Sequence, residues 1–167
     1  MPMKFVTRQN VRIDRVSSSW LIWTFIDPEA EILFVPTEEV IATAEHEDAI
    51  PFDVPGVAMS HHGNECSFDA ILQTYGPMDD PALEKLASVV RGADTPNKDL
   101  TPQSRGLDAI AHGYKALMTA EGYDDRESIR RQWHNYDALY LFFGGDPAKL
   151  RDPGSLGQQQ RSSRVRK

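Results

Sequence analysis

Proline and glycine divide this chain into short segments, which limits the length of every helix and strand that it can form. The sequence has 11 prolines and 11 glycines among its 167 residues. Asp27-Pro28 ends one apolar segment, because the residue before a proline is disfavoured in the α region, and Gly76-Pro77 ends another. No apolar run approaches the roughly 20 residues that a membrane span needs. The chain length and these breaks favour one domain built from short elements.

The apolar periodicity between the breaks predicts an α+β fold, mostly helical, with about five helices packed on a few short strands. Strands are predicted over residues 4–7, 31–35 and 57–60. The first helix should begin at Ser17 or Ser18 and end at Ile26, and the others should cover residues 66–75, 81–90, 102–118 and 125–143. A polar helix capped by Thr37 is predicted up to Glu47. Residues 1–147 should form the domain, and residues 148–167 a basic, disordered tail.

The charge of the chain is acidic and unevenly distributed. The formal net charge is −7, and the segment 151–167 carries +4, which leaves −11 for the rest. An acidic body argues against direct nucleic-acid binding by this domain. Cys66 is the single cysteine, so no internal disulfide can form. A lone thiol and the absence of a signal-peptide pattern at the N-terminus predict a cytoplasmic protein.

The densest polar stretch runs from Ser60 to Asp69 and contains side chains of the types that bind transition metals. His61 and Cys66 are its main candidate ligands, with Glu65 in reserve. Cys66 should lie at the start of a helix, where unpaired N–H groups favour a thiolate. The spacing matches no strong zinc signature. The alternative interpretation is a buried structural cysteine beside surface histidines.

A second group of polar residues precedes the first predicted helix. Arg12 and Arg15 could bind an oxyanion there, because guanidinium donors and the helix dipole both favour negative charge. The alternative is that Asp14 and Arg15 form a structural ion pair or cap. No Gly-rich phosphate loop, GxSxG elbow or HExxH motif occurs. Serine hydrolase, nucleotide kinase and zincin functions therefore lack support.

Two further carboxylates are candidates for a site. Asp94, in the run Arg91-Gly92-Ala93-Asp94, is either a metal ligand or a turn residue that bonds its own backbone. Asp137 lies in an aromatic-rich helix and should need a partner there, plausibly an arginine.

Several of these pieces together resemble the C-terminal domain of the chromate-resistance protein family, over residues from about 7 to about 143. The resemblance rests on ordered motifs that span nearly the whole predicted domain. They are Arg12-Ile13-Asp14-Arg15, Ser19-Trp20-Leu21-Ile22, residues 25–31, Pro51-Phe52-Asp53, Pro55-Gly56, His61, Cys66-Ser67-Phe68-Asp69, Val90-Arg91-Gly92-Ala93-Asp94, and Tyr136-Asp137-Ala138-Leu139-Tyr140.

The resemblance implies a role in chromate response or detoxification, without deciding whether the domain is catalytic. Full-length members carry an additional N-terminal region, whose functions do not transfer to this chain. Many members have His-Asp where this chain has Arg91-Gly92, and some have Cys at the position of Ser18. A metal site that used those residues would have fewer ligands in this chain.

Two site hypotheses follow from these residues. The first is one divalent transition metal, zinc or iron, held by His61, Cys66 and carboxylates such as Asp14 and Asp94. The second is a pocket for chromate or a related oxyanion, formed by Arg12, Arg15 and Arg91. A third possibility is a non-catalytic regulatory or protein-interaction module, in which the polar residues, Asp69 and Asp137 among them, are structural.

Overall fold

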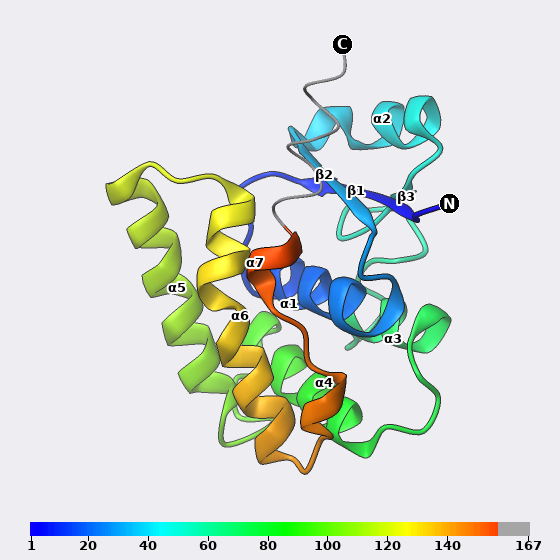
Figure 1. The fold of residues 1–167 in the computed structure, drawn as a ribbon. Helices are drawn as coiled ribbons and strands as arrows, with labels where there is room; N and C mark the ends of the chain where they lie inside the picture. The colour runs from blue at the N-terminus through cyan, green and yellow to red at the C-terminus, as the bar shows by residue number, and fades with distance from the viewer. Residues whose placement is uncertain (157–167) are drawn as a thin grey trace.

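A small parallel sheet organises the N-terminal third of the chain in the computed structural model, which describes residues 1–156. Its strands are β1 (Lys4–Arg8), β2 (Glu31–Val35) and β3 (Ile50–Pro51), in the order β2-β1-β3. Phe5 of the central strand pairs with Ile32 on one side and Ile50 on the other. Helices lie on both faces of the sheet, with α2 on one face and the larger helical layer on the other (Figure 1).

The helices make up most of the described chain, which confirms a mostly helical α+β fold. They are α1 (Ile13–Leu21), α2 (Val40–Glu47), α3 (Ser67–Tyr75), α4 (Pro81–Asp94), α5 (Ser104–Glu121), α6 (Asp125–Phe142) and the short α7 (Pro153–Leu156). A π-helical turn, Ile22–Ile26, follows α1, and 3-10 turns cover Thr37–Glu39 and Pro147–Lys149. No helix among residues 1–156 combines the length and the apolar character needed to cross a membrane.

Helix α1 occupies the centre of the molecule, between the sheet and the other helices (Figure 1). Every residue from Ile13 to Leu21 is buried, including Asp14 and Arg15. The hydroxyls of Ser17 and Ser19 donate to backbone carbonyls of the preceding turn, so these small polar residues fit a buried helix.

The structure corrects three local predictions. Helix α1 begins at Ile13, so Ser17 and Ser18 lie inside the helix and do not cap it. Thr37 also makes no cap, since it lies in the 3-10 turn that precedes α2. The third strand is Ile50–Pro51; the predicted strand at 57–60 contributes only an isolated bridge between Met59 and Phe52.

An aromatic core joins α1 to α6. Trp20 packs against Tyr136 and Tyr140, with ring centroids 5.9 and 6.2 Å away, and Phe25 lies 5.1 Å from Tyr140. These rings are large and mostly fully buried, so they supply much of the apolar area that stabilises the helical layer.

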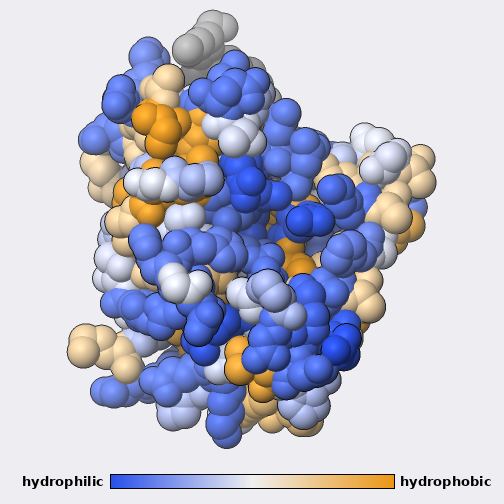
Figure 2. All heavy atoms as spheres, turned by 180° about the vertical axis from the view of Figure 1, so that it is seen from behind, coloured by the Kyte–Doolittle hydropathy of each residue, from blue (hydrophilic) through white to orange (hydrophobic). Residues whose placement is uncertain are grey.

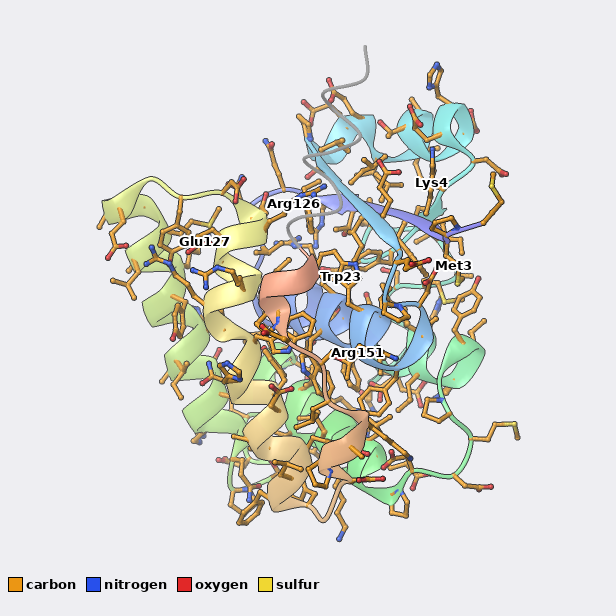
Figure 3. The ribbon with its side chains drawn as sticks, viewed as in Figure 1. Met3, Lys4, Trp23, Arg126, Glu127 and Arg151 are labelled. Atoms are coloured by element: carbon orange, nitrogen blue, oxygen red, sulfur yellow. The ribbon has the colours of Figure 1, made fainter. Side chains whose placement is uncertain are left out.

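The chain after α6 returns across the helical layer toward α1. The Arg151 carbonyl accepts from the Trp133 indole at 3.0 Å, and the Arg151 Nε donates to Thr24 O at 3.3 Å. Figure 3 shows Arg151 at this return, below α7, and Arg126 at the start of α6 pointing toward the sheet. The predicted basic tail is thus described up to residue 156, and its remainder, 157–167, lies outside the described residues.

Candidate metal centre

Polar side chains meet where the carboxyl ends of two parallel strands face the starts of two helices. Arg8 is the last residue of β1, and Asp53 follows β3. Asp14 lies in the first turn of α1, and Ser67 begins α3. In parallel α/β sheets this edge is the usual position of a ligand site.

Asp14 is held rigidly by the backbone at the start of α3. Its Oδ2 accepts from Ser67 N and its Oδ1 from Phe68 N, both at 2.9 Å. These N–H groups have no partner within their own helix, so the carboxylate satisfies them and benefits from the helix dipole. Asp14 is only 2% exposed. These two hydrogen bonds join residues that are more than 50 positions apart in the chain, and they fix α1 to α3.

His61 lies among three carboxylates. Its Nε2 is 3.1 Å from Asp94 Oδ2, 3.3 Å from Asp14 Oδ2 and 3.5 Å from Asp53 Oδ1. Hydrogen bonds to Asp14, Asp53 and Asp94 raise the pKa of His61 to about 12. The side chain stays 42% exposed, so this imidazole forms the solvent-facing side of the cluster.

Asp94 reaches the cluster from the last turn of α4. The helix was predicted to end at residue 90, but α4 continues through Arg91-Gly92-Ala93-Asp94, so Asp94 is a helical residue and not a turn residue. Burial raises the pKa of Asp94, and repulsion from Asp14 and Asp53 adds to this effect, while the hydrogen bond to His61 opposes it. Asp94 is therefore a carboxylate that would gain from a nearby cation.

Asp53 is a site residue that the analysis of candidate ligands missed. Burial disfavours its ionised form, but His61, Arg15 and Arg8 more than offset this and lower its pKa. Its backbone has a φ of 51°, a left-handed conformation that aspartate tolerates better than most residues. The motif Pro51-Phe52-Asp53 was visible in the sequence, but nothing there indicated that its carboxylate turns toward His61.

One ligand atom each from Asp14, His61 and Asp94 lies within 4.8 Å of the others, the only such group of three His, Cys, Asp or Glu side chains among the described residues. Two carboxylate oxygens and one imidazole nitrogen are suitable donors for a divalent transition metal. Their spacing is short enough for one ion to contact all three. The cluster can thus hold a cation, with His61 giving up its Nε2 proton to do so.

The three arginines expected to bind an oxyanion are not gathered into one pocket. Arg91 forms a two-pronged interaction with Asp69, from Nη2 to Oδ1 at 2.6 Å and from Nε to Oδ2 at 3.1 Å. Arg15 is buried, with Nη2 donating to Asn10 O and Nη1 3.6 Å from Asp53. Arg12 is exposed and forms no ion pair with any of the described residues.

Cys66 lies at the start of α3 as expected, but the prediction of a thiolate is wrong. The thiol is fully buried, and burial together with the charges of Asp14 and Asp69 raises its pKa. It acts as a donor to Asp69 Oδ2 at 3.3 Å, and the same oxygen accepts from Cys66 N at 2.9 Å. Cys66 thus caps α3, and Asp69 serves both this cap and Arg91.

The remaining candidates lie away from the cluster. Glu65 accepts from the Gln73 side chain on the surface of α3. Asp137 accepts from the Trp20 indole at 2.9 Å and is 3.1 Å from the His134 ring. The prediction of an arginine beside Asp137 is wrong for the described chain: the partners of this carboxylate there are the Trp20 indole N–H and the His134 ring.

An open pocket of about 760 Å³ lies next to the cluster. His61 and Asp53 belong both to the pocket wall and to the group of contacting carboxylates and imidazole. The wall is otherwise formed by Arg8, His62, Ser60 and the segment 54–58. Small molecules can therefore approach the exposed side of His61.

Comparison with known proteins agrees with the resemblance seen in the sequence. A family model described as the C-terminal domain of ChrB matches residues 5–143. The Protein ChrB of Cupriavidus metallidurans is 32% identical over 140 residues, which cover 84% of this chain and 40% of that protein. The chain thus spans less than half the length of this relative. No solved structure matches the chain.

Proposed function

Because the chain belongs to the ChrB C-terminal domain family, we propose that it is a chromate-response domain whose function depends on one divalent transition-metal cation bound by Asp14, His61 and Asp94. The observation that carries the proposal is the position of the His61 Nε2, 3.1 to 3.5 Å from three carboxylate oxygens. Asp53 is also paired with Arg8 and Arg15, whereas Asp14 and Asp94 share the one imidazole of His61. These two carboxylates therefore carry more negative charge than His61 offsets, and a metal ion would balance it.

The geometry favours a cation over an oxyanion as the ligand of this cluster. A dianion such as chromate would be repelled by Asp14, Asp53 and Asp94. The guanidinium groups of Arg15 and Arg91 are already paired with Asp53 and Asp69, so they would have to exchange partners to bind it. Chromate therefore enters the proposal through the family and not as a ligand of the carboxylates.

The donor set narrows the choice of metal. With the Cys66 thiol protonated and bonded to Asp69, the cluster offers one nitrogen and two oxygens. Imidazole suits zinc and iron, and added carboxylates also suit manganese, whereas a thiolate would have favoured zinc more strongly. Three protein ligands leave coordination positions open, and the adjoining pocket gives access to them. That arrangement is typical of reactive metal sites rather than of purely structural ones.

The proposal is tested by metal binding to the purified chain. Metal-stripped protein is titrated by calorimetry with Zn²⁺, Mn²⁺ and, without oxygen, Fe²⁺. We expect one equivalent of at least one metal to bind, and His61→Gln and Asp94→Asn to weaken it by roughly 100-fold or more, since each removes a ligand. His134→Gln is the matched control, because His134 is also a histidine beside a buried aspartate. Absence of binding, or equal loss in His134→Gln, would refute the site.

A further inference from the structure

The pocket beside His61 has features that the proposed metal centre does not use. It lies at the carboxyl ends of the neighbouring strands β1 and β3, since its wall includes Arg8, the last residue of β1, and Asp53, which follows β3. Ligands of parallel α/β sheets bind at such points, outside the carboxyl ends of the strands. Its volume of about 760 Å³ is far larger than a metal ion needs and falls in the range of small-molecule sites.

The wall of this pocket combines one cation with an apolar segment. Arg8, at the carboxyl end of β1, has a 33% exposed side chain and is fixed by hydrogen bonds from Nε to Asp53 O and from Nη2 to Asp53 Oδ2. Both bonds leave Nη1 unused among the described contacts, so this fixed guanidinium retains a donor. The apolar part of the pocket wall is formed by Val54, Pro55, Val57 and Ala58.

We infer that this pocket binds a small organic acid, whose acid group contacts Arg8 and whose apolar body lies against residues 54–58. A guanidinium held in one orientation can donate from its free Nη1 to a carboxylate or a phosphate group at little entropic cost. The apolar wall would add affinity for a body of a few carbon atoms and disfavour bare inorganic anions. The inference goes beyond the metal centre and does not require a bound metal.

The test uses 3-phenylpropionate and its neutral analogue 3-phenylpropanol as probes, with the full chain in buffer containing EDTA. We expect the acid to bind at least 10-fold more tightly than the alcohol by calorimetry, and Arg8→Gln to remove this preference. Lys4→Gln is the matched control, because Lys4 loses the same charge at the opposite end of β1. Equal binding of the two probes, or equal loss in both variants, would overturn the inference and leave the metal proposal untouched.

A different observation concerns helix α5, which leaves most of its surface uncovered. Of its 18 residues only Ser104, Leu107 and Ala111 are buried. Ile110 and Leu117 are 46% and 43% exposed. Figure 1 shows α5 at the edge of the molecule beside α6, and Figure 2 shows tan and orange apolar residues, mixed with hydrophilic blue ones, at the upper right, on the side where α5 lies in that view.

Two glycines interrupt this exposed face, Gly106 in the first turn of α5 and Gly113 in the interior of the helix. A Cβ atom at Gly106 or Gly113 would have no heavy atom of residues 1–156 within 4 Å outside its own surroundings in the helix. Glycine costs about 0.5–1 kcal/mol relative to alanine in a helix interior. Nothing within the described chain therefore requires the small size of these residues, whereas close approach by another backbone would.

We propose that α5 pairs with α5 of a second copy, antiparallel, with the two-fold axis at Gly113. In this register each large side chain faces a small one, so the two helices can approach closely. The facing pairs are Gly106 with Ala120, Ala109 with Leu117, and Ile110 with Ala116.

The charges at the two ends of α5 are complementary in the same register. Arg105, paired with Asp99, would face Glu121 of the second copy, which is paired with Arg131. Each end of the interface would then join two existing ion pairs into a four-residue network. A single pair of helices buries less than a standard interface of about 1,200–2,000 Å², so the dimer should be weak and concentration-dependent.

Cysteine cross-linking tests the register directly. Gly113→Cys places two thiols at the axis, so mild oxidation should give a disulfide-linked dimer on a non-reducing gel. Gly106→Cys is the control, because its two copies would lie about 21 Å apart along the helices, whereas Gly106→Cys with Ala120→Cys should cross-link. Ile110→Glu should abolish the Gly113→Cys product. Equal cross-linking of the two single variants, or none in any variant, would overturn the proposal; the unmodified chain, with Cys66 buried, supplies the background.

Discussion

Two buried aspartates, Asp14 in α1 and Asp137 in α6, each lie beside a histidine, yet their surroundings differ in one decisive respect. Asp14 shares His61 with Asp53 and Asp94, so three acids surround one base. Asp137 is the one carboxylate paired with His134 among the described residues, and its other oxygen accepts a hydrogen bond from the Trp20 indole. Its negative charge is thus matched by local donors. An aspartate–histidine contact by itself does not indicate a cation site; the excess of carboxylates does.

The largest expected difference between these two aspartates is in metal binding. Asp14→Asn should weaken binding of the metal by roughly 100-fold or more, because the amide is a poorer ligand and lowers the charge of the cluster. Asp137→Asn should leave it unchanged, since that residue faces the aromatic core. Calorimetric titration of both variants measures the contrast. Similar losses would show that the two regions are coupled and that the distinction between them is wrong.

Stability should distinguish the same two positions in a different way. Asp137→Ala should lower the free energy of unfolding by about 1–3 kcal/mol, because the buried Trp20 N–H loses its acceptor. Asp137→Asn keeps an acceptor oxygen and should recover most of that loss. Urea denaturation followed by tryptophan fluorescence checks both values. If asparagine were as damaging as alanine, the charge of Asp137 would matter, and its role would be more like that of Asp14.

Cys66 sharpens the comparison because it lies beside the carboxylate cluster without joining it. The raised pKa and full burial of its thiol should make alkylation by N-ethylmaleimide at least about 100-fold slower in the folded chain than in urea. Cys66→Ser should keep metal binding, since the thiol donates to Asp69. Mass spectrometry of the labelled protein gives the rates. Rapid labelling of the folded chain, or loss of metal binding in Cys66→Ser, would contradict this prediction and indicate that Cys66 belongs to the metal site.

The smallest effect is expected at Glu127, a half-buried carboxylate on the same helix as Asp137. Hydrogen bonds from Arg130 and then Arg131 lower its pKa to about 2. Figure 3 places Glu127 near the start of α6. Because a lowered pKa stabilises the folded state above the unfolded value of 4.5, the contribution should be full at pH 7 and fall as the pH drops toward 2.

Solvent screening limits that contribution to a few tenths of a kcal/mol. Glu127→Gln should therefore differ slightly from the unmodified chain in urea denaturation at pH 7 and hardly at all near pH 2.5. A difference that grows on acidification would contradict the sign of the pKa shift.

Local patterns in the sequence predicted much of the fold. The prolines and glycines that end apolar runs placed strands near 4–7 and 31–35 and helices near α3, α4, α5 and α6. The errors lie where tertiary contacts override local preference. The serines at 17 and 18 are typical helix caps, but burial between the sheet and α6 extends the helix back to Ile13. The third strand was predicted at 57–60, but Ile50 and Pro51 pair with β1 and complete the sheet.

The order of amino acids was enough to identify the residues that carry acids, bases and thiols, and most of the short elements in which they lie. It named Asp14, His61 and Asp94 as candidate ligands, since their types suit a metal. Which of these side chains meet could be seen only in the folded chain, because the three belong to different elements. Their approach depends on how α1, α4 and the loop before α3 pack. The same packing turned Cys66 away from the cluster to Asp69 and brought Asp53 in, a choice that long-range geometry makes and local spacing does not encode.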